Sequence, residues 1–186
     1  LSAEYTLMNI LRRAKKIATT DSTIFSTNAF SKFLYEKNSI TKDFFIKEKL
    51  LDNFAILDDY DILCSIKEWC NNNDKILSLL SNKIIKRELL KIIAIDPKDK
   101  STQLKELRQT AMKMFNLNEQ DVKLLVFPIC IGNETYNLIE DEITLLQKNL
   151  TTIKLSEIKQ EFNINTKNSK ITKHYICYPK ECLKKN

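Results

Sequence analysis

The chain has 186 residues, 43% of them hydrophobic and 29% charged, and a formal net charge of +6. This length buries a core and suits one domain or two small ones. The sequence has no apolar run near the roughly 20 residues of a membrane-spanning helix, and its single glycine excludes the Gly-rich phosphate loops of Walker and dinucleotide-binding folds.

The first part of the chain is predicted to be helical. Its first helix runs to about Ala18, and apolar residues at helical spacing give it one buried face. The opposite, solvated face carries the basic residues Arg12, Arg13, Lys15 and Lys16. Because residue 1 is not methionine and the apolar pattern begins almost at once, we expect a fragment that lacks an N-terminal portion. Two further helices are predicted over residues 28–36 and 43–53.

Residues 54–91 carry the clearest helical signals in the chain. Asp58, with Asp61 three residues later, predicts a capping box at the start of a helix. The buried face of this helix is predicted to carry Ile62, Leu63, Ile66, Trp69 and Cys70, with Trp69 filling the helical core. Three asparagines end the helix, Asp74 caps a second one, and a basic turn over residues 86–91 follows.

From residue 89 onward the pattern changes to short strands. Strand patterns occur over residues 89–95, 122–131, 135–138, 143–146, 152–155 and 172–178. Gly132-Asn133 is predicted to be a turn that closes the second of these strands. A helix capped by Ser101 or Thr102 is predicted to run to Phe115, and a short helix to start at Ser156.

These patterns predict the α+β class. An all-helical part, residues 1–88, is followed by a small α/β sandwich, residues 89–186, for which a ferredoxin-like arrangement is one option. No flexible linker separates the two parts.

Several motifs, in the right order, resemble the HD superfamily of phosphohydrolases, above all its dNTP triphosphohydrolase branch. They are the opening Leu57-Asp58-Asp59, Trp69 one turn before a helix end, Asp74-x-x-Leu77-x-x-Leu80 and the closing Arg87-x-Leu89-x-Lys91. Residues 1–14 look like the helix that follows the catalytic core in that family. The resemblance implies that residues 1–88 are HD-domain-associated helices completing an HD-type core, and that residues 89–186 serve oligomerisation or regulation.

The chain lacks the residue types of an HD active site. Such a site gathers several imidazoles and carboxylates around one or two metals, and this sequence has a single histidine, His174. The resemblance places the family's metal ligands N-terminal to the matched segment. We therefore expect no catalytic residue, no metal ligand and no cofactor in this chain, and a divalent metal in the parent enzyme.

Other candidate site residues have simpler interpretations. A structural or surface role suits His174 better than a zinc site with Cys177 and Cys182. The carboxylates of Asp58 and Asp61 are explained by helix capping rather than by acid/base chemistry. The five cysteines lack paired spacing, and Cys64, Cys70, Cys130 and Cys177 lie in apolar runs, which favours reduced thiols and a cytoplasmic protein.

Arg87 and Lys91 are the candidate regulatory contacts to a nucleotide phosphate. Four residues apart, they share one face if the preceding helix continues, and arginine offers phosphate a bidentate fork. The helix dipole alone also accounts for a basic helix C-terminus. In nucleotide-regulated members of the family, the matching arginine and lysine contact an allosteric nucleotide at a subunit interface, whereas Lys86 has no counterpart.

The ends of the chain are basic. Beyond the first helix, the basic residues are Lys167, Lys170, Lys173, Lys180, Lys184 and Lys185. Such ends fit an anionic partner, but solvated lysines explain them as well, because few aromatic residues lie between them.

Three functions remain open. The first is a C-terminal structural or regulatory portion of an HD-family nucleotide phosphohydrolase. Its partners would be the N-terminal HD portion of the same protein, further copies in a homo-oligomer, and a nucleotide, with no membrane. The alternatives are a stand-alone basic module that binds nucleic acid and a module that mediates protein interactions.

Overall fold

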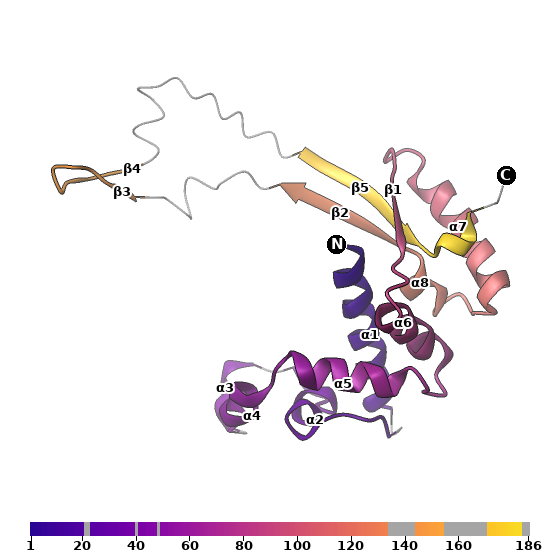
Figure 1. Ribbon diagram of the computed structural model, residues 1–186, viewed down its shortest axis with the longest axis horizontal. Coiled ribbons are helices and arrows are strands. Elements are labelled where there is room, and N and C mark those ends of the chain that lie inside the picture. Colours follow the sequence, from indigo (N-terminus) through magenta and orange to yellow (C-terminus); the bar gives the residue numbers. More distant parts are fainter. Residues whose placement is uncertain (21–22, 40, 48, 134–143, 155–170, 184–186) are drawn as a thin grey trace. The chain divides into compact units, whose positions relative to one another are not determined.

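The computed structural model describes residues 1–20, 23–39, 41–47, 49–133, 144–154 and 171–183 (Figure 1). Its helices and antiparallel strands confirm the α+β class. The chain divides into two compact units, of which unit 1 comprises Leu1–Pro128 and Tyr175–Asn186, and unit 2 comprises Ile129–His174. The predicted division near residue 88 stays a prediction.

Unit 1 opens with a helical region. Its helices are α1 (Ser2–Ala18), α2 (Asn28–Leu34), α3 (Lys42–Lys47), α4 (Leu51–Ile56), α5 (Asp59–Trp69) and α6 (Lys75–Ile85). The predicted end of the first helix is confirmed. The single helix predicted over residues 43–53 is instead two, because Lys49 adopts a left-handed conformation with φ 50°. The amide of Leu50 then donates to the carbonyl of Phe45 at 3.1 Å, which ends α3.

The helix caps predicted at Asp58 and Asp74 are confirmed. Asp58 Oδ1 accepts from the amides of Tyr60 and Asp61 at 2.8 and 3.2 Å, and Asp61 Oδ2 accepts from the Asp58 amide at 3.0 Å. Asp74 Oδ1 accepts from the Leu77 amide at 2.9 Å. These side chains satisfy amides that a helix start leaves without partners.

Trp69 fills the core as predicted. It is 1% exposed, its indole Nε1 donates to the carbonyl of Phe25 at 2.8 Å, and its ring lies against that of Phe30. The rest of the predicted α5 face is only partly correct, because Leu63 is 44% exposed whereas Ser65 is buried.

The second half of the chain contributes strands and further helices. In order these are β1 (Lys91–Ala94), α7 (Lys100–Phe115), α8 (Val122–Leu125), β2 (Phe127–Asn133), β3 (Thr144–Leu146), β4 (Thr152–Lys154), β5 (Ile171–Tyr178) and η1 (Lys180–Cys182). The three-stranded sheet has the order β1-β5-β2, with Lys91 opposite Tyr178 and Ala94 opposite Tyr175. In the described residues β3 and β4 pair in a separate sheet, which differs from a ferredoxin-like arrangement.

Local hydrogen bonds explain where the strand prediction fails. Residues 122–125 form α8 rather than a strand, because Asn118 Oδ1 accepts from the amides of Gln120 and Asp121 and starts a helical turn. Strand β2 runs through the predicted turn at Gly132-Asn133. Helix α7 starts at Lys100, so neither Ser101 nor Thr102 caps it.

Two predicted elements lie outside the described residues: the strand over 135–138 and the helix starting at Ser156.

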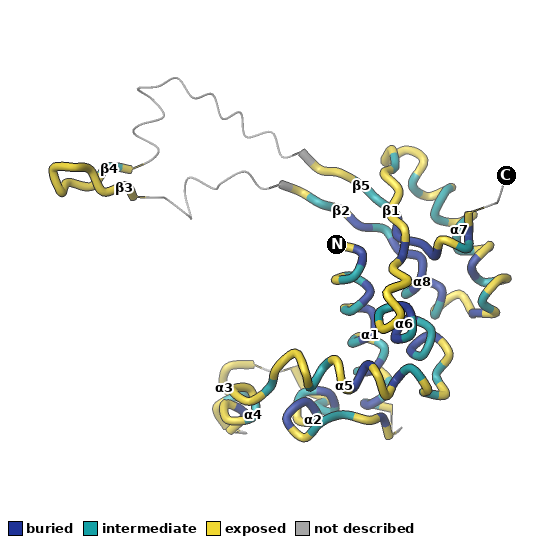
Figure 2. The backbone as a smooth tube through the Cα atoms, viewed as in Figure 1, coloured by how far each residue is buried: buried dark blue, intermediate teal, exposed yellow. Residues whose placement is uncertain are grey.

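The core of unit 1 lies where α1, α5, α6 and α8 pack together (Figure 2). Its fully buried side chains include Ile10, Ile66, Ile76, Leu77, Leu80 and Leu125. The buried face of α1 also carries polar residues that reach other elements: Ser2 Oγ donates to the carbonyl of Leu90, and Asn9 Nδ2 to that of Leu124. Helices α3 and α4, in contrast, bury no residue.

Candidate functional site

The predicted phosphate contacts Arg87 and Lys91 lie in the connection from α6 to β1. Helix α6 ends at Ile85 and the predicted turn follows, so the condition for a common helical face of Arg87 and Lys91 is not met. Both side chains are exposed, and Lys91 is the first residue of β1. Both cations therefore face solvent in the short segment from the end of α6 to the start of β1. A turn, not a helix, brings them there.

Arg87 has an unusual backbone conformation. Its φ is 58°, in the left-handed region. The amide of Glu88 donates to the carbonyl of Lys83 at 2.8 Å, and the amide of Arg87 donates to that of Ile84 at 3.1 Å. This pair of bonds is the Schellman motif, whose left-handed position is usually glycine. For a residue with a Cβ the conformation costs about 1–2 kcal/mol, so the motif by itself does not account for an arginine here.

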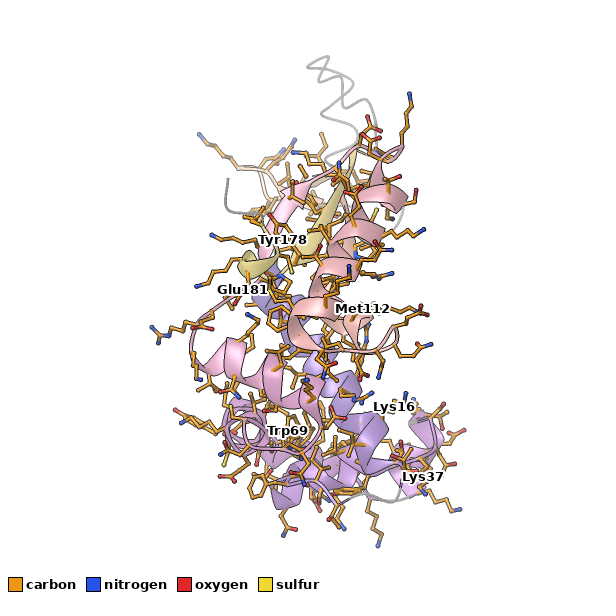
Figure 3. The ribbon with its side chains drawn as sticks, turned by 90° about the vertical axis from the view of Figure 1, so that its right-hand side faces the viewer. Lys16, Lys37, Trp69, Met112, Tyr178 and Glu181 are labelled. Carbon is orange, nitrogen blue, oxygen red and sulfur yellow. The ribbon has the colours of Figure 1, made fainter. Side chains whose placement is uncertain are left out.

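A polar pocket of about 640 Å³ lies beside α6, next to this turn in the sequence. Its lining includes Lys75, Lys83 and Lys86, together with Asn82, Phe115 and Glu181. Figure 3 shows Glu181 on the C-terminal segment that also carries Tyr178. Lys86, which matched no family residue, thus belongs to the pocket, whereas Arg87 is not among the lining residues.

A partly buried ion pair lies among the residues that line this pocket. Lys83 Nζ lies 3.1 Å from Glu181 Oε1, and the two side chains are 5% and 34% exposed. The same ammonium lies 5.7 Å from the centroid of the Phe115 ring. Burial raises the pKa of Glu181, but its hydrogen bonds and the charge of Lys83 outweigh burial, so the pKa is lowered overall. Glu181 therefore stays ionised at neutral pH.

Sequence reasoning missed this pair. Lys83 continues the i, i+4, i+7 row of Ile76 and Leu80, so the periodicity of α6 marks it as a buried position. Its partner lies 98 residues away, and no local signal indicates it.

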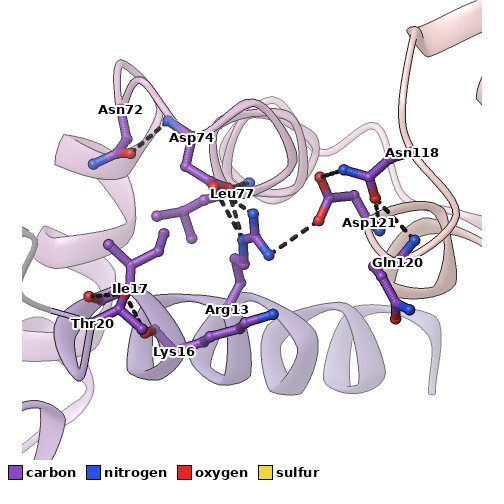
Figure 4. Close-up of polar contacts among 10 residues, drawn as sticks. All are labelled: Arg13, Lys16, Ile17, Thr20, Asn72, Asp74, Leu77, Asn118, Gln120 and Asp121. Carbon is purple, nitrogen blue, oxygen red and sulfur yellow. Dashed lines mark hydrogen bonds and ion pairs between the residues drawn. The ribbon is translucent and has the colours of Figure 1, made fainter.

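A second polar cluster joins α1 to α6 and α8 (Figure 4). The Arg13 guanidinium contacts both carboxylate oxygens of Asp74, the shorter contact being 2.6 Å, and lies 3.0 Å from Asp121 Oδ1. The three side chains are only 15–19% exposed. Asn118 Nδ2 donates to Asp121 Oδ2 at 2.9 Å and so holds that carboxylate in place.

Arg13 and Asp74 are both ionised in this cluster. The hydrogen bond to Asp74 raises the pKa of Arg13, against an opposing effect of burial. Burial raises the pKa of Asp74, but hydrogen bonds from Arg13 and from the Leu77 amide outweigh burial and lower the pKa overall. Both carboxylates contact the same guanidinium, so the cluster links α1, α6 and α8 rather than offering a free acid, base or phosphate contact.

The prediction of a solvated basic face on the first helix is therefore partly wrong. Arg13 is paired as described, and Lys15 Nζ donates to the carbonyls of Phe33 and Glu36. Lys173 and Lys180 are exposed. The other four lysines named near the C-terminal end lie outside the described part of the chain: Lys167, Lys170, Lys184 and Lys185.

The histidine and the cysteines form no metal site in the residues that the structure describes. His174 is half-buried, and its Nδ1 accepts or donates no hydrogen bond within that part of the chain. All five thiols are free. Cys64 and Cys130 are exposed although they lie in apolar runs, whereas burial of Cys177 raises its thiol pKa to about 11. No helix in the described residues is long and apolar enough to cross a bilayer.

Comparison with known proteins adds one relationship. No family model and no curated protein matches the chain. Its structure is similar to the crystal structure of a phosphohydrolase from Bacteroides thetaiotaomicron, with a TM-score of 0.76 and 30% sequence identity. The match covers 95% of this chain and 44% of that protein, so the chain spans less than half the length of the phosphohydrolase it matches. In sequence and in fold, the chain is related to a phosphohydrolase.

Proposed function

We propose that this chain is the C-terminal structural and regulatory portion of an HD-superfamily nucleotide phosphohydrolase. The similarity to a phosphohydrolase over 95% of the chain carries the proposal. The resemblance of the motifs from Leu57 to Lys91 to the dNTP triphosphohydrolase branch supports the finer assignment.

The catalytic metal is assigned to an N-terminal portion of the same protein. A divalent metal there would activate a water for attack on a nucleoside phosphate. The present chain has one histidine, and the described residues contain no group of three His, Cys, Asp or Glu side chains that fits a metal. The residues of this chain therefore act by supporting that portion, in a homo-oligomer, and by binding a regulatory nucleotide.

Arg87 and Lys91 are the proposed contacts to the regulatory nucleotide. Both are exposed, so a phosphate group can approach them from solvent. The left-handed conformation of Arg87 supports a role in binding, because strained non-glycine residues persist where the side chain is needed. The guanidinium would grip two phosphate oxygens, and the lysine would add a point charge.

The nucleotide contact is tested by thermal unfolding of the purified chain with and without dGTP and Mg²⁺. A ligand that binds only the folded state at a hundred times its Kd stabilises by about 2.7 kcal/mol. We expect dGTP to raise the Tm of the wild type. In the variant Arg87→Ala/Lys91→Ala, dGTP should raise the Tm much less. The matched control Lys67→Ala/Lys98→Ala removes two exposed lysines elsewhere and should keep the full gain in Tm. An unchanged gain in the Arg87/Lys91 variant contradicts the assignment.

The enzymatic part is tested on the complete protein. Metal-dependent release of phosphate from deoxynucleoside triphosphates, abolished by a chelator, is the expected result. Residues 1–186 alone should release none. Hydrolysis by residues 1–186, or a complete protein without metal-dependent activity, would overturn the proposal.

A further inference from the structure

The hairpin formed by β3 and β4 leaves its leucines in solvent. Leu145, Leu146 and Leu150 are 39%, 69% and 79% exposed, and most of the hairpin is exposed in Figure 2. In the described residues its sheet has no third strand. Because a two-stranded hairpin is marginally stable on its own in water, a surface that covers these leucines would stabilise it.

Leu150 stands at a position that favours glycine. Its φ is 65°, in the left-handed region. The amide of Leu150 donates to the carbonyl of Gln147 at 3.0 Å, and the amide of Gln147 donates to the carbonyl of Thr151 at 2.8 Å. These bonds close a three-residue loop whose last residue is usually a left-handed glycine. A leucine there is strained and exposed, and the hairpin alone gains nothing from its side chain, which indicates a contact outside the hairpin.

A second apolar surface, on α4 and the first turns of α5, is also exposed (Figure 2). Leu51 and Phe54, three residues apart, share a face of α4. Tyr60 and Leu63 likewise share a face of α5. These four residues, which we call the α4–α5 surface, are between 44% and 80% exposed. Exposed apolar groups gathered in this way are typical of a contact to another protein.

A pocket of about 530 Å³ adjoins the α4–α5 surface through Leu51. The residues that line it are Lys42, Phe45, Ile46, Lys49, Leu51 and Asp52. Its apolar members offer packing partners to a leucine side chain. Its two lysines are exposed, so their aliphatic stems can line the pocket while their ammonium groups stay in water.

The hairpin and the α4–α5 surface carry opposite charges. Residues 50–66 contain four aspartates and no lysine or arginine, and of these aspartates Asp52 and Asp59 are exposed and take no part in a helix cap. Residues 144–154 contain two lysines and no acidic residue, and Lys148 is exposed in the loop of the hairpin. An apolar, basic hairpin and an apolar, acidic surface on one chain complement each other, so the partner that fits both is a second copy.

We propose that the β3–β4 hairpin of one copy docks on the α4–α5 surface of a second copy. Leu146 and Leu150 pack against the exposed apolar groups and the adjoining pocket, and Lys148 lies toward Asp52 and Asp59. The inference names the contact of the homo-oligomer in the proposed function and rests on that part of it alone. It is independent of the nucleotide contact at Arg87 and Lys91.

The first experiment measures self-association of the purified chain by sedimentation over a concentration series. The mean mass of the wild type should rise with concentration. In Leu150→Gly the turn is kept, because glycine adopts left-handed φ freely, but the anchoring side chain is lost. Self-association should therefore weaken about tenfold or more, as expected for one leucine that is no longer buried.

Leu183→Ala, at an exposed leucine elsewhere in the described residues, is the control and should associate like the wild type. A wild type that stays monomeric at every concentration, or Leu150→Gly that associates as strongly as the wild type, would overturn the proposal.

The second experiment exchanges the charges of the two surfaces. Lys148→Glu and Asp52→Lys/Asp59→Lys should each weaken self-association, because like charges then face each other. The triple variant Lys148→Glu/Asp52→Lys/Asp59→Lys restores opposite charges and should recover much of it. Thermal unfolding checks that each variant is folded, and Lys98→Glu, at another exposed lysine, should have no effect. A triple variant that associates no better than the single-surface variants contradicts the pairing of these two surfaces.

The variants also separate this contact from the proposed nucleotide contact. Arg87→Ala/Lys91→Ala should self-associate like the wild type whether or not dGTP stabilises the chain. If the wild type self-associates and the hairpin and α4–α5 variants do so equally well, the homo-oligomer forms through another surface. The present inference then fails, and the proposed function stands.

Discussion

Arg13 and Arg87 show how differently two similar basic segments are used. In the sequence, each arginine stands beside further basic residues at the end of a helical pattern. In the structure, Arg13 is 16% exposed and is paired with Asp74 and Asp121 at the junction of α1, α6 and α8. Arg87 is exposed and sits in a left-handed turn.

The difference lies in what the fold places opposite each charge. Arg13 meets two carboxylates that come from distant parts of the chain, so its charge stabilises the fold. Arg87 faces solvent in a conformation that costs free energy, so its charge is open to a ligand. Charge in a sequence thus indicates function only once its partners are known.

The largest expected effect is the loss of Arg13. Arg13→Met removes the guanidinium that both partly buried carboxylates of Asp74 and Asp121 contact, which should destabilise the protein by about 3 kcal/mol. Urea denaturation measures the change. The neighbouring Arg12→Ala is the control and should stay within about 0.5 kcal/mol of the wild type, because Arg12 is exposed. If the two variants are equally stable, the junction is not held by this ion pair.

The dependence of Tm on pH tests the same ion pair between Arg13 and Asp74. The pKa of Asp74 is lowered in the folded state, so its contribution is complete above the unfolded value near 3.9 and is lost as the pH falls below it. The Tm of the wild type should therefore fall between pH 6 and pH 3.

Glu181 also has a lowered pKa and adds to this loss in both proteins, so the comparison with Arg13→Met is the informative one. Without Arg13, the pKa of Asp74 is lowered only by the hydrogen bond from the Leu77 amide and by the charge of Lys16, so the Tm of the variant should fall less over that range. Identical acid profiles would show that Asp74 draws its ionisation from elsewhere.

Much of the local structure could be predicted from the sequence, because it depends on residues three or four apart. The caps at Asp58 and Asp74 and the burial of Trp69 belong to this class. The Arg13–Asp74 and Lys83–Glu181 pairs could not be predicted, since their partners lie 61 and 98 residues apart. The basic turn predicted over residues 86–91 does follow the end of α6 at Ile85, but the left-handed conformation within it could not be predicted, because an arginine stands at the position that usually carries glycine.

Substitution of Arg87 should change the stability of the protein in the opposite direction to substitution of Arg13. Arg87→Gly should stabilise the protein by about 0.5–1 kcal/mol, because relief of the left-handed strain exceeds the entropy that glycine adds to the unfolded chain. The matched control is Lys86→Gly, at a right-handed position with φ −81°, which should destabilise by about 1 kcal/mol. Chemical denaturation of both variants checks the signs, and a destabilised Arg87→Gly would mean that the arginine side chain supports the fold.

The most direct test of a regulatory phosphate contact at this turn is the Tm gain produced by dGTP in Arg87→Gly. Unliganded Arg87→Gly should unfold at a higher temperature than the wild type, yet gain much less Tm from dGTP, a combination that damage to the fold cannot produce. A variant that keeps the full dGTP-induced gain would contradict the assignment of Arg87 as a nucleotide contact.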